Sequence, residues 1–304
     1  AILTGLLTAA GNSRTPFIVN VAGLVFNVVL DPVLIFGIGP FPELGVSGAA
    51  AATVTAQALV SLLFFKAVLR EKVLFPHLRL WVLVPVKVWR EIVRIGVPSA
   101  VQNLIYAGIS MILTRLITGW GDLAVAAQRV GSQIESVSWM VGDGFSAAVN
   151  AFLGQNYGAK RYDRVRRGYF CAIAMTAAWG LCTTFLLIGM ARPLFSIFLQ
   201  EEEVMAIGVN YLRIVGLSQM FMMVEQTSIG AFSGLGRTLY PSIVSVTFTS
   251  ARIPVAVLLS SVMGLSGIWW ALSISSMVKG CILFVSFVLF LYVFLERKKD
   301  EKTV

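Results

Sequence analysis

The chain has 304 residues, of which 57% are hydrophobic and 13% are charged. Soluble globular domains average about 45–50% apolar and about 25% charged residues, and one soluble core cannot bury so large an apolar excess. The composition therefore excludes a soluble enzyme and indicates an integral membrane protein. The formal net charge of +9 would favour nucleic-acid binding in a soluble protein, but in a membrane protein basic residues are typical of cytoplasmic loops. We expect no nucleic-acid partner.

Residues that carry metal or phosphate chemistry are scarce. Cys171, Cys182 and Cys281 lie in apolar runs at unrelated spacings, which favours packing over a disulfide framework or a metal site. The sequence has no Gly-Lys pair, so the P-loop pattern of an ATPase is absent. It also lacks the paired Asp-rich motifs with which a prenyl transferase holds magnesium and diphosphate. We expect a protein that is not an enzyme and has no cofactor.

The predicted elements are transmembrane helices, each of which needs about 20 mainly apolar residues. Residues 1–10 look like the end of one such helix. Eight further segments are long and apolar enough to span a bilayer: residues 16–37, 46–69, 93–118, 123–153, 168–190, 204–229, 239–261 and 265–294. The predicted fold class is an all-α integral membrane protein with about eight transmembrane helices plus a stub.

Basic and acidic residues alternate between the connecting loops. Most of the 24 Lys and Arg residues lie in one set of loops, at Arg14, 66–94, 160–167, Arg237 and the tail from Arg297 to Lys302. The opposite set carries acidic residues, at Glu43, Asp122 and 201–203. The positive-inside rule places the basic loops and the C-terminus in the cytoplasm. We expect a multi-pass protein of the cell membrane, in particular a prokaryotic inner membrane.

Two short sequence patterns recur in the same order. Residues 11–15 recur 223 residues later, and residues 44–48 recur 219 residues later, which predicts a parallel repeat of the kind found in secondary transporters. Four spans precede the second copy but only a stub precedes the first, so we expect an N-terminally truncated piece of a two-lobe transporter with six helices per lobe. Residues 1–80 would be the remnant of the N-terminal lobe with the start of a cytoplasmic linker, and residues 81–304 the complete C-terminal lobe.

Polar side chains inside a span are costly and usually face a hydrated cavity or another helix. In the first span, Asp31 lies directly before Pro32, and Asn27 lies one helical turn earlier on the same face. Such a carboxylate is neutral when protonated and can otherwise hold a small cation; Thr53 lies on the next span. The alternative is that Asp31 pairs with a cation such as Arg252, which occupies the corresponding region of the second repeat.

Helical spacing places further polar residues on single faces of later spans. The candidate cavity residues are Asn103 and Tyr106 in 93–118, Gln128, Ser132 and Glu135 in 123–153, and Glu225 in 204–229. Several polar faces together predict a central hydrated cavity. Hydrogen bonding between helices without a transport role is the alternative and is favoured for single Ser, Thr or Asn residues. Function is favoured for Glu135, because a buried carboxylate is costly.

Several motifs carry a family resemblance. They are the run from Gly11 to Pro16, Asn27 with Asp31-Pro32, the run from Gly48 to Thr53, the run from Ala127 to Glu135, and the stretch from Gly144 to Ala159. In this order they resemble motifs of the multidrug and toxic compound extrusion (MATE) transporters, in particular the DinF-like branch of bacteria and archaea. The resemblance covers essentially the whole chain, from the end of the family's fourth helix to its twelfth.

The resemblance implies two six-helix lobes, alternating access, and export of small organic cations or amphipathic drugs driven by inward movement of H⁺ or Na⁺. Asn27, Asp31 and Thr53 match the coupling site in the N-terminal lobe of that branch, with Na⁺ as one candidate ion at Asp31. Another branch carries a glutamate on the seventh helix, where this sequence has Tyr106. The substrate would occupy the cleft near the candidate cavity residues, Asn103, Tyr106, Gln128, Ser132, Glu135 and Glu225.

Two alternatives stay open beside drug export. A lipid-linked saccharide flippase of the same superfamily would have a more cationic cavity than Glu135, Glu225 and Asp143 indicate. A passive channel fits the composition, but the repeat and the asymmetric position of Asp31 favour a transporter. The lipid bilayer is the expected surrounding, and the oligomeric state is open.

Overall fold

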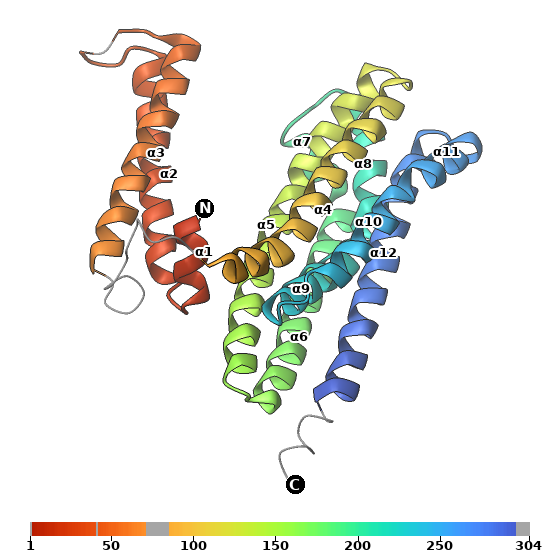
Figure 1. The fold of residues 1–304 in the computed structure, drawn as a ribbon. Coiled ribbons are helices and arrows are strands. Elements are labelled where there is room, and N and C mark those ends of the chain that lie inside the picture. The colour runs from red at the N-terminus through yellow and green to blue at the C-terminus, as the bar shows by residue number, and fades with distance from the viewer. Residues whose placement is uncertain (1, 41, 71–84, 296–304) are drawn as a thin grey trace. The chain divides into compact units, whose positions relative to one another are not determined.

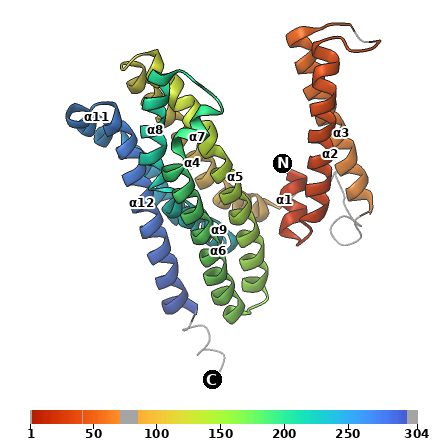
Figure 2. The ribbon, with the colours of Figure 1, turned by 180° about the vertical axis from the view of Figure 1, so that it is seen from behind.

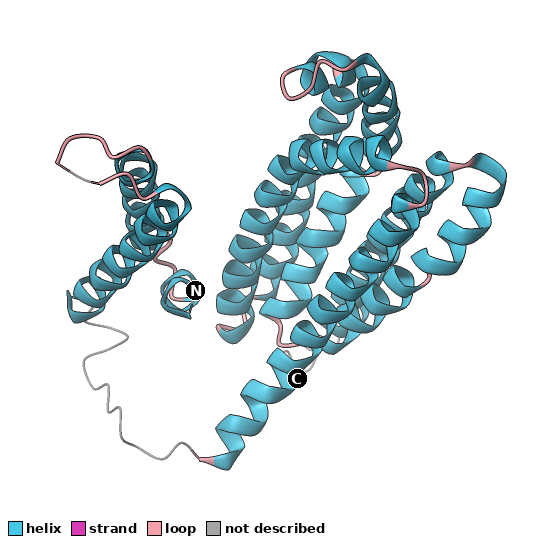
Figure 3. Cartoon of the chain, turned by 90° about the horizontal axis from the view of Figure 1, so that it is seen from above, coloured by secondary structure: helices cyan, strands magenta, loops and turns pink. Residues whose placement is uncertain are grey.

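The computed structural model describes residues 2–40, 42–70 and 85–295, and within them the chain is helical and contains no strand. The all-α prediction is confirmed, as Figure 3 shows from above. The chain divides into two compact units, Ala1–Leu83 and Val84–Val304 (Figure 1). The predicted lobe boundary between residues 80 and 81 lies outside the described residues.

The first unit consists of a short helix and two long ones, α1 (Ile2–Ala9), α2 (Arg14–Ile35) and α3 (Gly45–Arg70). α1 corresponds to the predicted stub. Leu7, Val19 and Phe64 form the buried core of this unit. A Cβ added to Gly48 would collide with the carbonyl of Leu34, so the missing side chain lets α2 and α3 approach closely.

The second unit contains the remaining helices. In chain order they are α4 (Val86–Thr118), α5 (Asp122–Gly158), α6 (Tyr162–Gly189), α7 (Ala191–Ser196), α8 (Glu202–Gly216), α9 (Gln219–Gly234), α10 (Leu239–Ser250), α11 (Arg252–Met263), α12 (Leu265–Phe290) and a π-helical turn, η1 (Leu291–Leu295). The long helices α5 and α6 run side by side, as the front and back views show (Figures 1 and 2).

Helix α9 lies at the centre of the second unit and packs against α5, α6 and α12. Gly230 and Gly234, four residues apart, face the α5 backbone at Ser146 and Asn150 without room for a Cβ. Two small residues at this spacing allow close packing of membrane helices. Most side chains of α9 are buried, which makes this helix the structural centre of the unit.

Six helices of the described part are long and apolar enough to cross a membrane, and the bent pair α8–α9 makes a seventh. Several helices of this length and hydropathy are typical of a multi-pass membrane protein. The expected eight included α5, which is not among them. Over its 37 residues, α5 carries Asp122, Arg129, Glu135 and Asp143, so polar side chains dilute its apolar character.

The span predicted at 204–229 is not one continuous helix, because the chain forms α8 and α9 with a bend of 50° between them. At the break, the N–H of Ser218 donates to the carbonyl of Val215, so the carbonyl of Ile214 loses its helical partner. The hydroxyl of Ser273 donates to Ile214 O at 2.9 Å, and that of Thr184 donates to Gly216 O at 2.9 Å. Neighbouring helices thus satisfy the carbonyls that a break inside a membrane would leave unpaired.

Candidate functional site

A cavity of about 480 Å³ with both apolar and polar lining residues is formed by the second unit. Its lining comes from α4, α5, α8, α9, α11 and α12, and includes Tyr106, Ser110, Thr114, Gln128, Ser132, Glu135, Trp139, Asp143, Tyr211, Ser218, Met222, Arg252 and Ser276. The α5 residues among them recur every three or four positions, which puts them on one helical face. This is the polar face predicted from the sequence, and the structure brings Gln128, Ser132 and Glu135 to the same cavity.

Glu135 is a carboxylate in this cavity that accepts three side-chain hydrogen bonds. Its Oε1 accepts hydrogen bonds from Trp139 Nε1 at 3.1 Å and from Gln219 Nε2 at 3.0 Å, and its Oε2 accepts one from Tyr211 OH at 3.1 Å. Three donors from α5, α8 and α9 therefore orient one side chain. Gln219 is fully buried, and its Oε1 has no hydrogen-bond partner among the described residues, which leaves one acceptor free beside the carboxylate.

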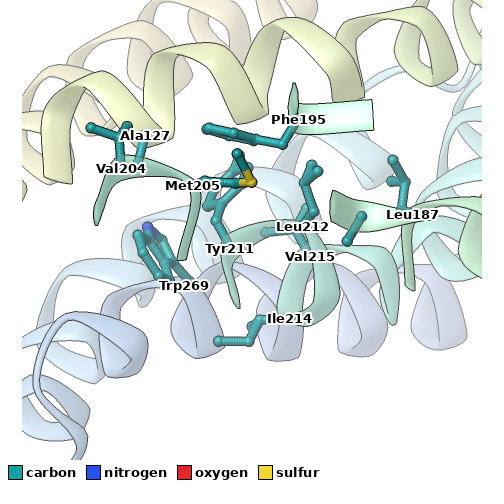
Figure 4. Packing of buried hydrophobic residues seen from close by; sticks show 11 residues of the cluster. Ala127, Leu187, Phe195, Val204, Met205, Tyr211, Leu212, Ile214, Val215 and Trp269 are labelled. Carbon is teal, nitrogen blue, oxygen red and sulfur yellow. The ribbon is translucent and has the colours of Figure 1, made fainter. Parts of the chain in front are cut away.

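Gln128 is fixed at the other end of the α5 face. Its Oε1 accepts a hydrogen bond from Trp269 Nε1 of α12 at 3.0 Å. The Trp269 ring packs edge-on against Tyr211, with 5.3 Å between ring centroids. Both rings belong to an apolar cluster in which α8 supplies most of the side chains, seen in Figure 4 with Ala127 of α5. This apolar cluster therefore holds the polar face of α5 in position.

A second cavity, of about 310 Å³, adjoins the first. Tyr106, Trp139 and Asp143 line both cavities, and the rings of Tyr106 and Trp139 lie 6.0 Å apart at an angle of 49°. Asn103 and Glu225 line the second cavity. All six candidate cavity residues therefore lie on the walls of these two adjoining spaces, within the second unit.

Glu225 does not face the second cavity as a free carboxylate. Lys279 of α12 donates to its Oε1 at 2.7 Å, and the two side chains are only 6% (Lys279) and 9% (Glu225) exposed. The attraction within a buried ion pair offsets part of the cost of taking its two charges out of water. The pair connects α9 to α12 near the middle of the α12 span.

Arg252, at the start of α11, lines the first cavity and is 5% exposed. Its Nε donates to Ser275 Oγ, and its Nη2 donates to Ser276 Oγ at 3.0 Å. The two cavities therefore hold cationic as well as acidic side chains.

The candidate coupling site lies in the first unit. Asn27 Nδ2 donates to Asp31 Oδ1 at 3.3 Å, one turn apart on α2. Thr53 is exposed on α3, and its hydroxyl donates to Ala49 O of its own helix at 3.0 Å. The structure brings Asn27 and Asp31 together, while Thr53 makes a bond within α3. In the described parts of the chain, no three metal-binding side chains of the His, Cys, Asp or Glu type form a cluster.

A family model described as MatE matches residues 98–258, more than half of the chain. The chain belongs to the MatE family. The matched residues include the α4 and α5 faces of both cavities and the break between α10 and α11.

Relatives in this family include a probable multidrug resistance protein NorM of Thermotoga maritima, which is 31% identical over 283 residues, covering 88% of this chain and 58% of that protein. An FAD transporter of Shewanella oneidensis is 26% identical over 280 residues, covering 90% of this chain and 61% of that protein. This MatE chain thus spans about three fifths of the length of these relatives.

Solved MatE-type structures share the fold at low sequence identity. A mutant of the MATE transporter VcmN of Vibrio cholerae has a TM-score of 0.81 at 22% identity, covering 96% of this chain and 66% of that one. A transporter of the MOP superfamily from Pyrococcus furiosus, described as having a binding pocket of reversed polarity that suggests a different function, has a TM-score of 0.87 at 21% identity. It covers 97% of this chain and 66% of that one.

Two cavity residues of this MatE chain were missed by sequence reasoning. Lys279 was not considered, and Arg252 was considered only as a partner for Asp31. The sequence could have indicated Lys279, because it is the only charged residue of α12. An ionisable residue inside a span is a functional candidate by default. The interpretation of the cavity as mainly acidic is therefore corrected: Lys279 and Arg252 stand on its walls beside Glu135, Asp143 and Glu225.

Proposed function

We propose that this MatE chain works as part of a secondary transporter that exports small organic cations or amphipathic drugs across the cell membrane in exchange for H⁺ or Na⁺. The observation that carries the proposal is the pair of adjoining cavities in the second unit, lined by aromatic and polar side chains. A ligand pocket of a few hundred Å³ that combines aromatic walls with few polar groups is typical of small-molecule sites.

The chemistry of the larger cavity suits an organic cation. Glu135 supplies a carboxylate whose position is fixed by Trp139, Gln219 and Tyr211. The rings of Tyr106 and Trp139, which line both spaces, offer faces that attract a cation. The multidrug resistance protein of Thermotoga maritima named above supports drug-like compounds as the substrate class.

Ion coupling is assigned to Asp31 and Asn27, with Thr53 on the neighbouring helix. Asp31 would alternate between a free state and a protonated or Na⁺-bound state, and Asn27 orients its carboxylate in either case. An ion can change the balance of two conformations only through its different affinity for them. Alternating access would then follow from coupling between this site and the cavities, with the C-terminus on the cytoplasmic side.

Ethidium transport into everted membrane vesicles tests the proposal. We expect the product of the gene with its upstream sequence to accumulate ethidium when an H⁺ or Na⁺ gradient is imposed, and the 304-residue chain alone not to do so. Glu135→Gln should lower ethidium transport by about tenfold or more, because it removes the charge from the cavity. Glu201→Gln, at an exposed glutamate beside α8, is the matched control and should transport normally.

The outcomes separate the candidate functions. Accumulation that an ionophore abolishes supports a coupled exporter, whereas equilibration without accumulation indicates a passive channel. No ethidium movement in either form contradicts drug export and favours the lipid-linked saccharide flippase. Arg252 and Lys279 are the observation that keeps the flippase as a second candidate, because they make the cavity less acidic than the sequence indicated.

A further inference from the structure

A groove of about 420 Å³ on the second unit shares none of its described lining residues with the two cavities. Most of the lining comes from α5, α6 and α7, and Phe198 lies just beyond α7. Val137, Trp179 and Phe198 are exposed, so the groove opens to the outside of the unit. None of the described residues that line it is charged. On a membrane protein, such a surface suits contact with lipid hydrocarbon, which is as apolar as leucine.

The groove occupies one half of the α6 span. Its α6 residues extend from Trp179 to Leu187, which corresponds to a rise of about 12 Å along the helix axis. This length is close to that of one leaflet of the hydrocarbon core, about 15 Å. The basic stretch 160–167 lies at the opposite end of α6, and the positive-inside rule places that stretch in the cytoplasm. The groove would therefore lie in the outer leaflet.

The volume of the groove suits a single acyl chain. A methylene group takes up about as much space as a molecule of liquid water, about 30 Å³, so the groove accommodates about 14 methylene groups. Bulk lipid offers a hydrocarbon chain an equally apolar environment, so apolar surface alone gives no preference for the groove. A lipid is retained there only if shape or polar contacts favour it.

Ser138 contributes a buried hydroxyl to the groove. The residue is 4% exposed, and its Oγ has no hydrogen-bond partner among the described residues. Serine and threonine hydroxyls inside helices often donate to a carbonyl of the preceding turn. Ser136 donates to Gln133 O at 2.6 Å, and Thr183 donates to Gly180 O at 3.0 Å. The Ser138 hydroxyl is thus left for a ligand, since a largely apolar groove offers water too few partners.

Gln133 is a second polar residue of the groove. It is exposed and lies five residues before Ser138 on α5, about 7.5 Å along the helix axis. Because α5 and α6 run antiparallel (Figure 1), Gln133 lies nearer the outer end of the groove and Ser138 lies deeper. An ester carbonyl beside the Gln133 amide would place the middle of its acyl chain near Ser138. A saturated chain has no acceptor there, whereas a double bond offers π electrons to the hydroxyl, which is a weak favourable contact.

We propose that this groove binds one acyl chain of an outer-leaflet phospholipid and prefers a monounsaturated chain to a saturated one. The Gln133 amide donates to the ester carbonyl, the apolar walls of α6 and α7 pack along the hydrocarbon, and the Ser138 hydroxyl faces the double bond. The lipid site is separate from the two cavities, so the proposal does not depend on which compound the protein transports.

Fluorescence quenching of Trp179, which lines the groove, tests the site. The purified 304-residue chain in detergent micelles would be titrated with a dibromostearoyl phosphatidylcholine, whose bromine atoms replace the double bond of an oleoyl chain and quench nearby tryptophans. Subtracting the signal of a Trp179→Phe variant isolates the quenching of this residue. We expect the quenching to saturate at a low lipid fraction. Dioleoyl phosphatidylcholine should then displace the brominated lipid at about two- to fivefold lower concentration than distearoyl phosphatidylcholine.

Substitutions of two exposed cysteines on α6 locate the bound lipid. Cys182 lines the groove, whereas Cys171 is not among its lining residues. Cys182→Phe should fill the groove and abolish the saturable quenching, while Cys171→Phe, the matched control, should retain it. Ser138→Ala removes only the hydroxyl. It should make the two competing lipids equally effective and leave the affinity for distearoyl phosphatidylcholine unchanged within about twofold.

Several outcomes would overturn the proposal. Quenching that rises in proportion to the lipid fraction without saturating indicates ordinary contact with lipid and no site. Absence of Trp179 quenching means that detergent or a second copy of the chain covers the groove. Equal loss of quenching in Cys182→Phe and Cys171→Phe would place the lipid elsewhere, and equal displacement by the two lipids in the wild-type chain would refute the preference for a double bond. The wild-type titration and Ser138→Ala decide the matter even if Cys182→Phe does not fold.

Discussion

The ion pairs Glu225–Lys279 and Arg192–Glu202 have similar geometry in different surroundings. The nitrogen–oxygen distances are 2.7 Å and 2.8 Å, but the Arg192 and Glu202 side chains are 67% and 70% exposed, against 6% and 9% for Lys279 and Glu225. Exposed pairs contribute little, because water screens both charges. A buried pair is sensitive instead to the removal of one partner, which leaves the other charge unpaired.

Glu225→Gln should therefore destabilise the protein strongly, by about 3–5 kcal/mol, since Lys279 would stay buried without its counter-charge. The double variant Glu225→Gln/Lys279→Met should recover much of this loss, because neither charge is then buried. Thermal unfolding in detergent would measure both effects, with Glu202→Gln as the exposed control. A double variant as unstable as Glu225→Gln would contradict the explanation.

Asp31 gives a prediction about coupling. Asp31→Asn keeps the size of the side chain and can still bond to Asn27, but it can neither ionise nor hold a cation by charge. We expect the substitution, made in the intact protein, to abolish coupled export while the protein stays in the membrane. Drug resistance of cells would measure export, with Asp122→Asn at an exposed position in the first turn of α5 as control. Full resistance with Asp31→Asn would refute the assignment.

At the scale of the helices, the contact between α5 and α9 depends on glycine. A methyl group at Gly230 would collide with the carbonyl of Ser146, whereas nothing lies within 4 Å of the corresponding position at Gly144. Gly230→Ala should lower stability by about 1–3 kcal/mol through overpacking. Gly144→Ala, in the same helix pair, should be neutral or stabilising by up to about 1 kcal/mol, because alanine favours helix. Unfolding in detergent would measure the stability of both variants. Equal stability of the two would argue against a tight contact between α5 and α9 at Gly230.

The helices also show which features local sequence can predict. Long apolar runs predicted the spans, and regular spacing predicted the polar face of α5, because both depend on residues close together in the chain. The break between α8 and α9 was not predicted. Its carbonyls are satisfied by Thr184 and Ser273, 32 and 59 residues from their acceptors, and such long-range partners leave no local pattern.

At the scale of the whole molecule, the charged residues of the two cavities also depend on contacts between residues far apart in the chain, which local sequence does not reveal. The spacing of acids and amides in the sequence indicated Glu135 and Glu225 but not Lys279. Lys279 and Glu225 are 54 residues apart, and only the folded second unit shows that they neutralise each other. Arg252 was visible in the sequence as a basic residue inside a span, but only the structure shows that it lines a cavity.

The ion pair between Glu225 of α9 and Lys279 of α12 also affects how the chain inserts into the bilayer. Synthesis proceeds from the N-terminus, so α9 arrives before α12, and Glu225 meets the lipid without its partner. A lone lysine near a helix centre costs about 2.5–3.5 kcal/mol on translocon insertion scales. A carboxylate already in place lowers that cost for α12. In a glycosylation-mapping assay, α12 should insert less efficiently after Glu225→Gln than after Glu202→Gln, and equal insertion would mean that the two charges meet only later. If Glu225→Gln does lower the insertion of α12, the last helix of the second unit depends on a charge that entered the membrane three helices earlier.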